Sequence, residues 1–305
     1  MRNRLLCRIT GSFKKSHMKI QNIWKTGILT WEDADALCIS VVFTWFLPKA
    51  RKYADMMQHR RVRIGGPAVD LMPTFFFGSH AEIGGDYPGV LQRFNHLATR
   101  TSIGCPRECD FCSVPLVAAK KSMAMSGKRI TPLPDWPDLP VLADDNLLFT
   151  PVEHFDRVCD RLEKHGWCDF NQGIDCRVLT DHHAERIARI KRPTVRMALD
   201  FTKLFDSWDR AFEKLRRAGI AKHNIRTYCI LANKGEDGQI RSPEEAWKVC
   251  KFVEDHGVKP LPMWFHGLSA MERNKVTPEQ EQGGWNDYER RKIMQWFYQH
   301  KVAVA

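Results

Sequence analysis

Three cysteines stand close together in the stretch "GCPRECDFCSVP", residues 104–115. They are Cys105, Cys109 and Cys112, in a C-x3-C-x2-C pattern. A closed structural zinc site takes four ligands, and an iron–sulfur cluster of the ferredoxin kind takes four cysteines. The local pattern supplies three, so a four-iron cluster held here would leave one iron open. An open iron can bind a small molecule, and this favours a catalyst over a simple electron carrier.

The other cysteines supply no obvious fourth ligand. None forms a C-x2-C pair, and most fall in helix or strand patterns, where a buried thiol is the usual explanation. They are Cys7, Cys38, Cys159, Cys168, Cys176, Cys229 and Cys250. The alternative is a zinc site that a histidine completes. Within the loop, Pro106 turns the chain away from the preceding strand, and Phe111 gives the site an apolar flank.

Length and composition indicate a soluble protein in a reducing compartment. The chain has 305 residues, and 43% of them are hydrophobic. The N-terminus has no apolar signal segment, and the longest apolar run, "ALCISVVFTWFL", is shorter than the roughly 20 residues that span a bilayer. We therefore expect a cytoplasmic protein without a membrane segment, in which clustered cysteines bind metal more often than they pair.

The net charge of +11 comes largely from a basic leader. Seven Lys and Arg residues lie between Arg2 and Lys25, and no acidic residue comes before Glu32. The rest of the chain has 40 basic and 36 acidic residues and is nearly balanced. The leader is either solvated or in contact with phosphates, so nucleic acid is a possible partner.

The elements around the loop follow a strand–helix alternation. Short apolar runs, separated by helical patterns, begin near Val141, Cys168, Val195, Ile225 and Leu261. With a strand at "RTSIG" before the cysteines, they predict an α/β fold with a parallel sheet and about six βα units. Reactive groups in such sheets lie at the carboxyl ends of the strands. The cysteine loop follows the first strand, so we expect it at that edge.

Helix ends are marked clearly in two segments, residues 150–166 and 242–257. Each opens with a hydroxyl N-cap, Thr150 or Ser242, followed by proline at the first helical position and by a glutamate that closes a capping box. Each ends on a glycine. These signals predict the two helices and their boundaries.

The two ends of the chain differ from this alternation. Residues 1–72 predict the basic leader plus a small Rossmann-like βαβ remnant, and residues 73–97 predict a linker. Residues 271–305 predict a C-terminal helical extension. We expect its aromatic side chains to pack against the sheet, because aromatics at helical spacing are usually core; the alternative is a platform that stacks bases.

The loop resembles the signature of the radical S-adenosylmethionine (radical SAM) enzymes. Their pattern is C-x3-C-x2-C after the first strand, with an aromatic directly before the third cysteine, and Cys105, Cys109, Phe111 and Cys112 match it. The resemblance covers residues 98–270 and implies a partial (βα)6 barrel. It implies that the three cysteines hold a [4Fe–4S] cluster whose open iron binds S-adenosylmethionine. An electron from a flavodoxin- or ferredoxin-like donor would then produce a 5′-deoxyadenosyl radical, which abstracts hydrogen from an unidentified substrate.

The resemblance also implies cofactor-binding positions at other strand ends. The turn after the second strand would bind the amino group of S-adenosylmethionine, and an arginine after the third would pair with its carboxylate. The fourth strand would reach the ribose or the substrate, and the fifth the adenine, although Lys234 and Gly235 depart from the usual turn there. The residues are Phe111 beside the cluster, then Asp144, Asp145, Asn146, Arg177, Asp200, Ile230 and Leu231. No catalytic residue is assigned; Asp200, Tyr228 and His266 are candidates for substrate contact, with a buried core role as the alternative.

The order of elements looks most like the radical SAM proteins that carry a cobalamin-binding domain in front. Here only about one βαβ unit precedes the linker, and no D-x-H-x-x-G motif occurs. We therefore expect no cobalamin, with that domain truncated. Two alternatives remain: a cobalamin-dependent radical SAM methyltransferase that needs a partner domain, and a non-catalytic module that binds zinc and nucleic acid.

Overall fold

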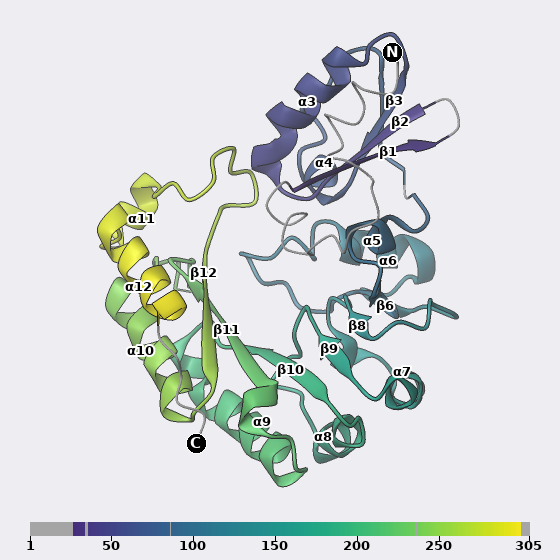
Figure 1. Ribbon diagram of the computed structural model, residues 1–305. Helices are drawn as coiled ribbons and strands as arrows, with labels where there is room; N and C mark the ends of the chain where they lie inside the picture. Colours follow the sequence, from purple (N-terminus) through teal and green to yellow (C-terminus); the bar gives the residue numbers. More distant parts are fainter. Residues whose placement is uncertain (1–26, 34–35, 86, 236, 300–305) are drawn as a thin grey trace. The chain divides into compact units, whose positions relative to one another are not determined.

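The computed structural model describes residues 27–33, 36–85, 87–235 and 237–299 (Figure 1). The chain forms two compact units. The first runs to His96 and includes Ser269–Glu272, and the second comprises Leu97–Leu268 and the chain from Arg273 onward. The basic leader and Cys7 lie outside the described residues.

The first unit is built on a four-stranded sheet in the order β1-β2-β3-β4. β1 (Ile28–Asp33) pairs antiparallel with β2 (Ala36–Val41), whereas β2, β3 (Arg61–Gly65) and β4 (Ala81–Ile83) are parallel. Every residue of β2 is buried, so the apolar run of the sequence begins as a strand. The helices among the described residues of this unit are η1 (Thr44–Phe46), α3 (Leu47–Met56), α4 (Pro67–Leu71) and α5 (Val90–Phe94).

This unit is larger than the single βαβ remnant that the sequence predicts. The β2–α3–β3 unit is present as expected, but β1 and β4 extend the sheet on both sides. Residues 73–97, predicted as a linker, contain β4 and α5. The sequence does not reveal β4 because it is a three-residue edge strand with no buried residue. Gly66 is required between β3 and α4: its φ is +104°, and a Cβ there would lie 2.6 Å from the Val41 carbonyl oxygen.

The second unit contains a six-stranded sheet, within the part of the chain that the structure describes, in the order β12-β11-β10-β9-β8-β5. All neighbouring pairs are parallel, and the strands follow their order in the sequence. The strands are β5 (Ala98–Thr99), β8 (Val141–Leu142), β9 (Cys168–Phe170), β10 (Pro193–Ala198), β11 (Ile225–Leu231) and β12 (Lys259–Trp264). The helices that connect them include α7 (Val152–His165), α8 (Asp181–Ala188), α9 (Phe205–Arg217) and α10 (Pro243–Asp255), with the short turns η2 (Leu147–Phe149), η3 (Thr202–Leu204) and η4 (Lys222–Asn224). This is the mixed α/β architecture with a parallel sheet that the alternation predicts.

The two faces of this sheet have different environments. Alternate residues such as Val195, Met197 and Cys229 are fully buried in a core that they share with Phe155 and Trp208 of the helices. The burial of such side chains stabilises the unit by about 1.5–3 kcal/mol each. The residues between them are half-buried or exposed, as the burial patterns of β10 and β11 show. Parallel sheets are usually covered on both faces, so the partial exposure of this second, accessible face is unusual for a sheet of this kind.

The strand before the cysteine loop differs from its prediction. "RTSIG" does not continue the main sheet: β5 ends at Thr99, and β6 (Ser102–Gly104) pairs antiparallel with β7 (Ile130–Pro132). The cause is a buried carboxylate, since Asp144 accepts hydrogen bonds from the backbone N–H groups of Thr101 and Ser102. These two N–H groups are therefore unavailable to the main sheet, and Ser102 pairs with Pro132 of β7 instead. α6 (Ala118–Ser126) lies between β6 and β7 in the sequence.

Helix ends agree with the sequence in part. At α10, Ser242 accepts a hydrogen bond from the Glu245 backbone N–H, with Pro243 at the first position, as predicted. At α7, by contrast, the N-cap is Pro151 and no side chain caps it. The Thr150 hydroxyl instead donates to the Leu147 carbonyl oxygen at 2.7 Å. The predicted cap is wrong because this hydroxyl terminates the preceding turn η2.

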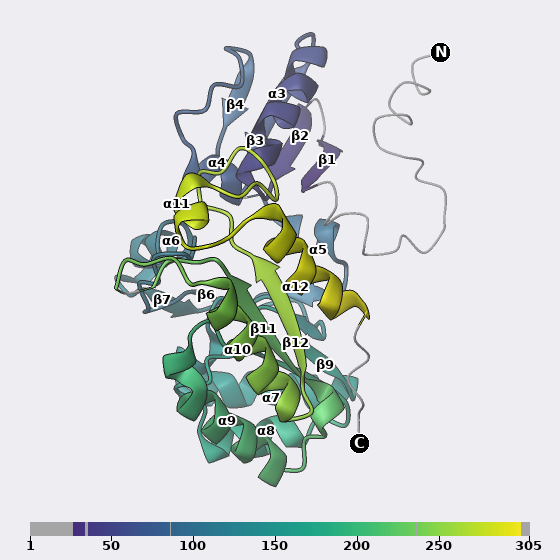
Figure 2. The same ribbon diagram turned by 90° about the vertical axis from the view of Figure 1, so that its left-hand side faces the viewer.

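The C-terminal helix packs on the second unit. α11 (Pro278–Gln282) precedes α12 (Asp287–Gln299), and Figure 2 shows α12 beside α10 and β12. Trp285, just before α12, is buried; its ring meets Trp264 edge-on, and its Nε1–H donates to the Arg241 carbonyl oxygen. Trp296 contacts Trp247. These contacts give Trp285 the expected packing role, whereas Tyr288 is exposed and Trp296 is half-buried.

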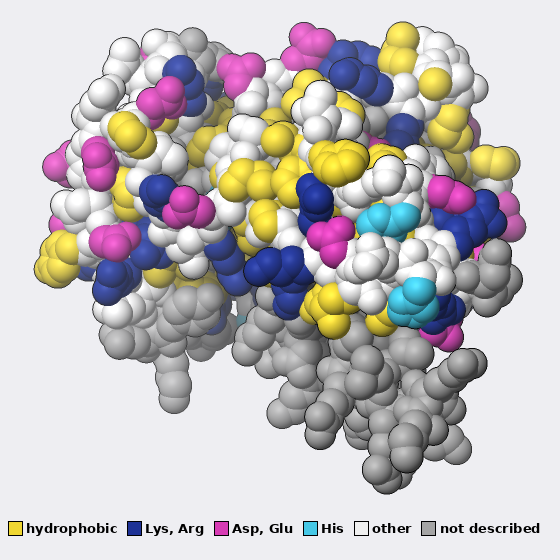
Figure 3. Space-filling view, turned by 90° about the horizontal axis from the view of Figure 1, so that it is seen from above, with side chains coloured by type: hydrophobic (Ala, Val, Ile, Leu, Met, Phe, Trp, Pro, Cys, Tyr) yellow, Lys and Arg dark blue, Asp and Glu magenta, His cyan; other side chains and the backbone are white. Residues whose placement is uncertain are grey.

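The described surface carries both charges. On the face seen in Figure 3, Lys and Arg side chains are interspersed with Asp and Glu. This agrees with the nearly balanced charge of the sequence after the leader. Among the residues described, no helix has the length and apolar character that crossing a bilayer requires.

Candidate functional site

The cysteine loop begins directly after β6. Gly104 is required there, because its φ is +94° and a Cβ would lie 2.1 Å from the Arg129 carbonyl oxygen. Cys105 is buried, and Cys109 and Cys112 are half-buried. The backbone N–H of Cys112 donates to the Cys109 carbonyl oxygen at 3.0 Å, which folds the loop into a tight turn. The three thiols are thus carried on one short, compact segment.

Backbone N–H groups already point at two of the three sulfurs. The Arg107 N–H donates to Cys105 Sγ and the Val114 N–H to Cys112 Sγ, both at 3.5 Å. Such donors stabilise thiolates, which are the form that binds iron. Phe111 faces Phe201 with ring centroids 6.0 Å apart, which joins the loop to the segment after β10. Phe111 therefore supplies the apolar flank that the sequence predicts.

Burial raises the pKa of Cys109, and it raises that of Cys112 to about 11. Neighbouring cysteine thiolates raise both pKa values further. A group of thiolates in this environment needs positive charge to compensate it, and a metal cluster supplies that charge.

The cysteine loop carries three candidate sulfur ligands. Among the described residues, no three His, Cys, Asp or Glu side chains converge on a single ion position. A four-iron cluster does not require such convergence, since each cysteine ligates a different iron. The other described cysteines are buried, as the sequence predicts: Cys38, Cys159, Cys168, Cys176, Cys229 and Cys250.

The three polar residues of the turn after β8, Asp144, Asp145 and Asn146, have different partners. Asp144 is buried, and its Oδ1 accepts from the backbone N–H and the hydroxyl of both Thr101 and Ser102, at 2.5–2.9 Å. Burial raises the pKa of this carboxyl, and the four donors oppose that rise. Asp145 accepts from the Gly104 N–H at 2.9 Å and so holds the start of the cysteine loop. Oδ1 of Asp144 is thus held by the fold, whereas its Oδ2 is buried and has no hydrogen-bond partner, so the role of Asp144 as a cosubstrate ligand stays a prediction.

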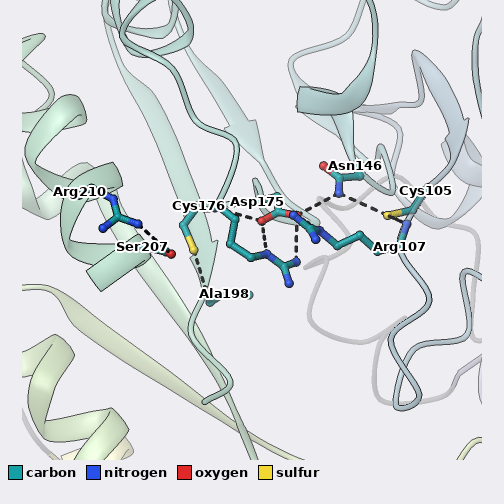
Figure 4. A network of polar contacts seen from close by, with 9 residues as sticks. Cys105, Arg107, Asn146, Asp175, Cys176, Ala198, Ser207 and Arg210 are labelled. Carbon is teal, nitrogen blue, oxygen red and sulfur yellow. Dashed lines mark hydrogen bonds and ion pairs between the residues drawn. The ribbon is translucent and has the colours of Figure 1, made fainter. Parts of the chain in front are cut away.

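Asn146 is the third residue of this turn, and it faces the cysteines. Its Nδ2–H donates to Cys105 Sγ at 3.3 Å and lies 3.5 Å from Oδ2 of Asp175 (Figure 4). Its Oδ1 is buried and has no hydrogen-bond partner. A buried acceptor without a donor costs about 1–3 kcal/mol, so this oxygen marks a place where a ligand donor would be stabilising.

Asp175, after β9, is the centre of the charged network in Figure 4. Only 5% of its side chain is exposed. It accepts from Arg107 Nε at 2.5 Å, and from Arg177 Nε and Nη2 at 2.7 and 2.9 Å. Burial raises the pKa of Asp175, but the two guanidinium groups outweigh it and hold that pKa below its usual value.

The predicted role of Arg177 is to pair with the carboxylate of S-adenosylmethionine, and the bonds to Asp175 leave fewer N–H groups for it. Its Nε and Nη2 are engaged by Asp175, and its Nη1 is outside that pair. Arg107 is not among the site residues predicted from the sequence. Its position between the first two cysteines of the loop is the signal that could have indicated it. Its guanidinium also lies 5.2 Å from the Phe149 ring centre.

The remaining predicted positions lie at the ends of β10 and β11. Asp200 accepts from the Ile230 backbone N–H at 3.3 Å, and burial raises the pKa of Asp200 to about 6. Ile230 is half-buried, on the accessible face of the sheet. Leu231 is fully buried among the helices. Successive strand residues point to opposite faces, so the Leu231 side chain points away from that of Ile230, and the adenine contact of both residues stays a prediction.

Two candidates for substrate contact have partners within the protein. The Tyr228 hydroxyl donates to the Asn171 carbonyl oxygen at 2.9 Å and accepts from Arg196, which also binds Asp169. His266 Nε2 accepts from the Asn274 backbone N–H at 2.9 Å. These bonds give both side chains structural roles, the alternative that the sequence left open.

The mixed α/β fold with a parallel sheet is shared with solved structures of a radical SAM enzyme. Two solved structures of TsrM, a radical S-adenosylmethionine methyltransferase from Kitasatospora setae, are similar to this chain. One holds tryptophan substrate and the S-adenosylmethionine analogue aza-SAM, with a TM-score of 0.51 and 12% identity. The other holds cobalamin and a [4Fe–4S] cluster, with a TM-score of 0.50 and 11% identity.

The similarity covers 83% of this chain, and 65% and 66% of the two TsrM chains. This chain therefore spans about two thirds of their length. The 83% of the chain that is covered is more residues than the second unit has, so the match extends into the first unit. No protein-family model and no curated protein matches the chain.

Proposed function

We propose that this protein is a radical SAM enzyme that holds a [4Fe–4S] cluster on Cys105, Cys109 and Cys112. The observation that carries the proposal is the C-x3-C-x2-C loop at the carboxyl edge of the parallel sheet, in a fold shared with radical SAM enzymes. When bound, the cluster would supply one electron to cleave S-adenosylmethionine into a 5′-deoxyadenosyl radical, which abstracts hydrogen from a substrate of unassigned identity.

The residues around the loop fit the cosubstrate. The unpartnered Oδ1 of Asn146 is an acceptor placed beside Cys105, and an ammonium group of S-adenosylmethionine would satisfy it. Nη1 of Arg177, outside the Asp175 pair, can donate to the carboxylate. Asp145 contributes indirectly, because it holds Gly104 at the start of the loop.

The accessible face of the sheet is the proposed place for the substrate. The six sequential parallel strands support a partial (βα)6 barrel, whose inner face this would be. Ala198 is exposed there although β10 is a central strand. Asp200 and Ile230 lie at the carboxyl end of the same region, joined by a hydrogen bond. With its pKa near 6, Asp200 can exchange a proton close to neutral pH.

The test is anaerobic reconstitution with iron and sulfide, followed by reduction with S-adenosylmethionine and an assay for 5′-deoxyadenosine. We expect a brown protein that releases 5′-deoxyadenosine, whereas the Cys109→Ala variant releases none. Cys229→Ala, which removes a thiol from the core, is the matched control and retains the activity. A colourless protein that holds zinc and cleaves no S-adenosylmethionine would refute the proposal and support the binding-module alternative.

A second candidate is cobalamin-dependent methyl transfer. It is favoured by the extension of the TsrM match into the first unit, since one of those structures holds cobalamin. This points against our expectation that the chain binds no cobalamin, which rests on the absent D-x-H-x-x-G motif. Titration of the purified protein with cobalamin, followed by its visible spectrum, distinguishes the two: a saturable spectral change supports methyl transfer, and no change supports hydrogen abstraction alone.

A further inference from the structure

The orientation of the Asn146 amide is fixed by its surroundings. The two groups near Nδ2 are Cys105 Sγ, at 3.3 Å, and the Asp175 carboxylate, at 3.5 Å. A metal-bound thiolate and an ionised carboxylate can only accept hydrogen bonds. The amide must therefore direct its N–H groups toward them, and its oxygen the other way.

We propose that Asn146 tunes the reduction potential of the cluster by donating a hydrogen bond to the Cys105 sulfur, and that Asp175 holds it in position. The inference rests on the proposed function, because it concerns the cluster that the three cysteines would bind. It assigns Asn146 a second task, on the opposite side of its amide from the cosubstrate.

The negative charge on the Cys105 sulfur links this hydrogen bond to the reduction potential. Reduction adds an electron to the cluster and increases the negative charge on its ligands, so a donor to a ligand sulfur stabilises the reduced form more than the oxidised form. Cys105 is buried, where a hydrogen bond is stronger than in water. Cys105 also has the second donor from the Arg107 backbone, so it is the most strongly hydrogen-bonded sulfur of the three in the described contacts.

Asp175 holds the Asn146 side-chain amide in position. The carboxylate is held by Arg107 of the cysteine loop and by Arg177 of its own segment, and it accepts from Asn146. Figure 4 shows Asn146 between Cys105 and Asp175, with a dashed line to each. The same carboxylate thus connects the cysteine loop, the turn after β8 and the turn after β9.

The test is a redox titration of the reconstituted full-length protein, followed by the electron paramagnetic resonance signal of the reduced cluster, without S-adenosylmethionine. In Asn146→Leu we expect the potential to fall, with about a three- to tenfold lower ratio of reduced to oxidised cluster at a fixed potential. In Asn146→Asp, which keeps the shape but replaces the donor with a negative charge, we expect a larger fall. Asn224→Leu, at the amino end of β11, is the control and leaves the potential unchanged.

Asp175→Asn provides a test of opposite sign. The asparagine oxygen can still accept from Asn146, so the amide keeps its place. The variant removes a negative charge near the cluster and leaves the charges of Arg107 and Arg177 uncompensated, so the potential should rise. If the potential falls in Asp175→Asn as well as in the Asn146 variants, general loosening of the loop explains the change and the inference is overturned. An unchanged potential in Asn146→Leu also overturns it.

Loss of the cluster is informative too. If neither Asn146 variant binds iron while Asn224→Leu does, Asn146 has a structural role only, and the tuning role is refuted. If the wild-type protein itself binds no cluster, the proposed function fails and this inference fails with it. If the wild-type protein binds the cluster but its potential is unchanged in the Asn146 variants, only this inference fails and the proposed function stands.

Discussion

The replacement of Asp144 by alanine tests the interpretation that Oδ1 of this residue stabilises the fold. Its Oδ1 accepts four hydrogen bonds from Thr101 and Ser102. In Asp144→Ala the two hydroxyls can rotate toward other acceptors, but the two backbone N–H groups cannot. Each stranded N–H costs about 1–3 kcal/mol, so we expect the free energy of unfolding to fall by about 2–6 kcal/mol.

Asp144→Asn separates the hydrogen bonds from the charge. An asparagine oxygen can still accept from the two backbone N–H groups, so the expected loss is only about 1 kcal/mol. The charge itself is unfavourable in this place, because burial raises the pKa of the Asp144 carboxyl. A carboxyl with a raised folded-state pKa opposes folding as the pH rises above its unfolded value, and Asp144→Asn removes this contribution.

The assay is urea unfolding of the cluster-free protein at neutral pH, followed by tryptophan fluorescence. Asp138→Ala is the matched control, because Asp138 is exposed and pairs with His165 on the surface, where such pairs contribute about 0–1 kcal/mol. A loss of less than 1 kcal/mol in Asp144→Ala, equal to that of the control, would refute the structural role of Oδ1.

Three further predictions follow from the packing. Gly104→Ala should lower stability and abolish cluster binding, measured by iron content, because the Cβ meets the Arg129 carbonyl oxygen at 2.1 Å and φ is positive; normal iron content would contradict this. Burial lowers the pKa of His154 to about 4, so stability should decline as the pH falls from about 6.5 to about 4. His154→Gln should flatten that decline in acid-unfolding curves, and an unchanged curve would argue against it. Leu231→Ala should cost about 2–5 kcal/mol, whereas Ile230→Ala should cost less and weaken S-adenosylmethionine binding, measured by calorimetry; equal stability losses would place both residues in the core.

The sequence predicted the main architecture because that information is local. The alternation of apolar runs and capped helices gave the parallel sheet of the second unit, and the cap at Ser242 is confirmed. Predictions failed where a distant residue intervened. "RTSIG" leaves the main sheet because Asp144 takes its backbone donors, and Thr150 terminates the turn η2 instead of capping α7.

The sequence by itself determined the identity and spacing of the three cysteines, on which the proposed class of chemistry rests. The three cysteines lie within eight positions, so their pattern can be recognised from the sequence without the fold. Only the tertiary structure decided the partners of the surrounding charges. Asp175 lies 68 positions from Arg107, and Asn146 lies 41 positions from Cys105. Such pairs depend on the register and order of the strands, and these are fixed by the burial of the whole sheet rather than by any single segment.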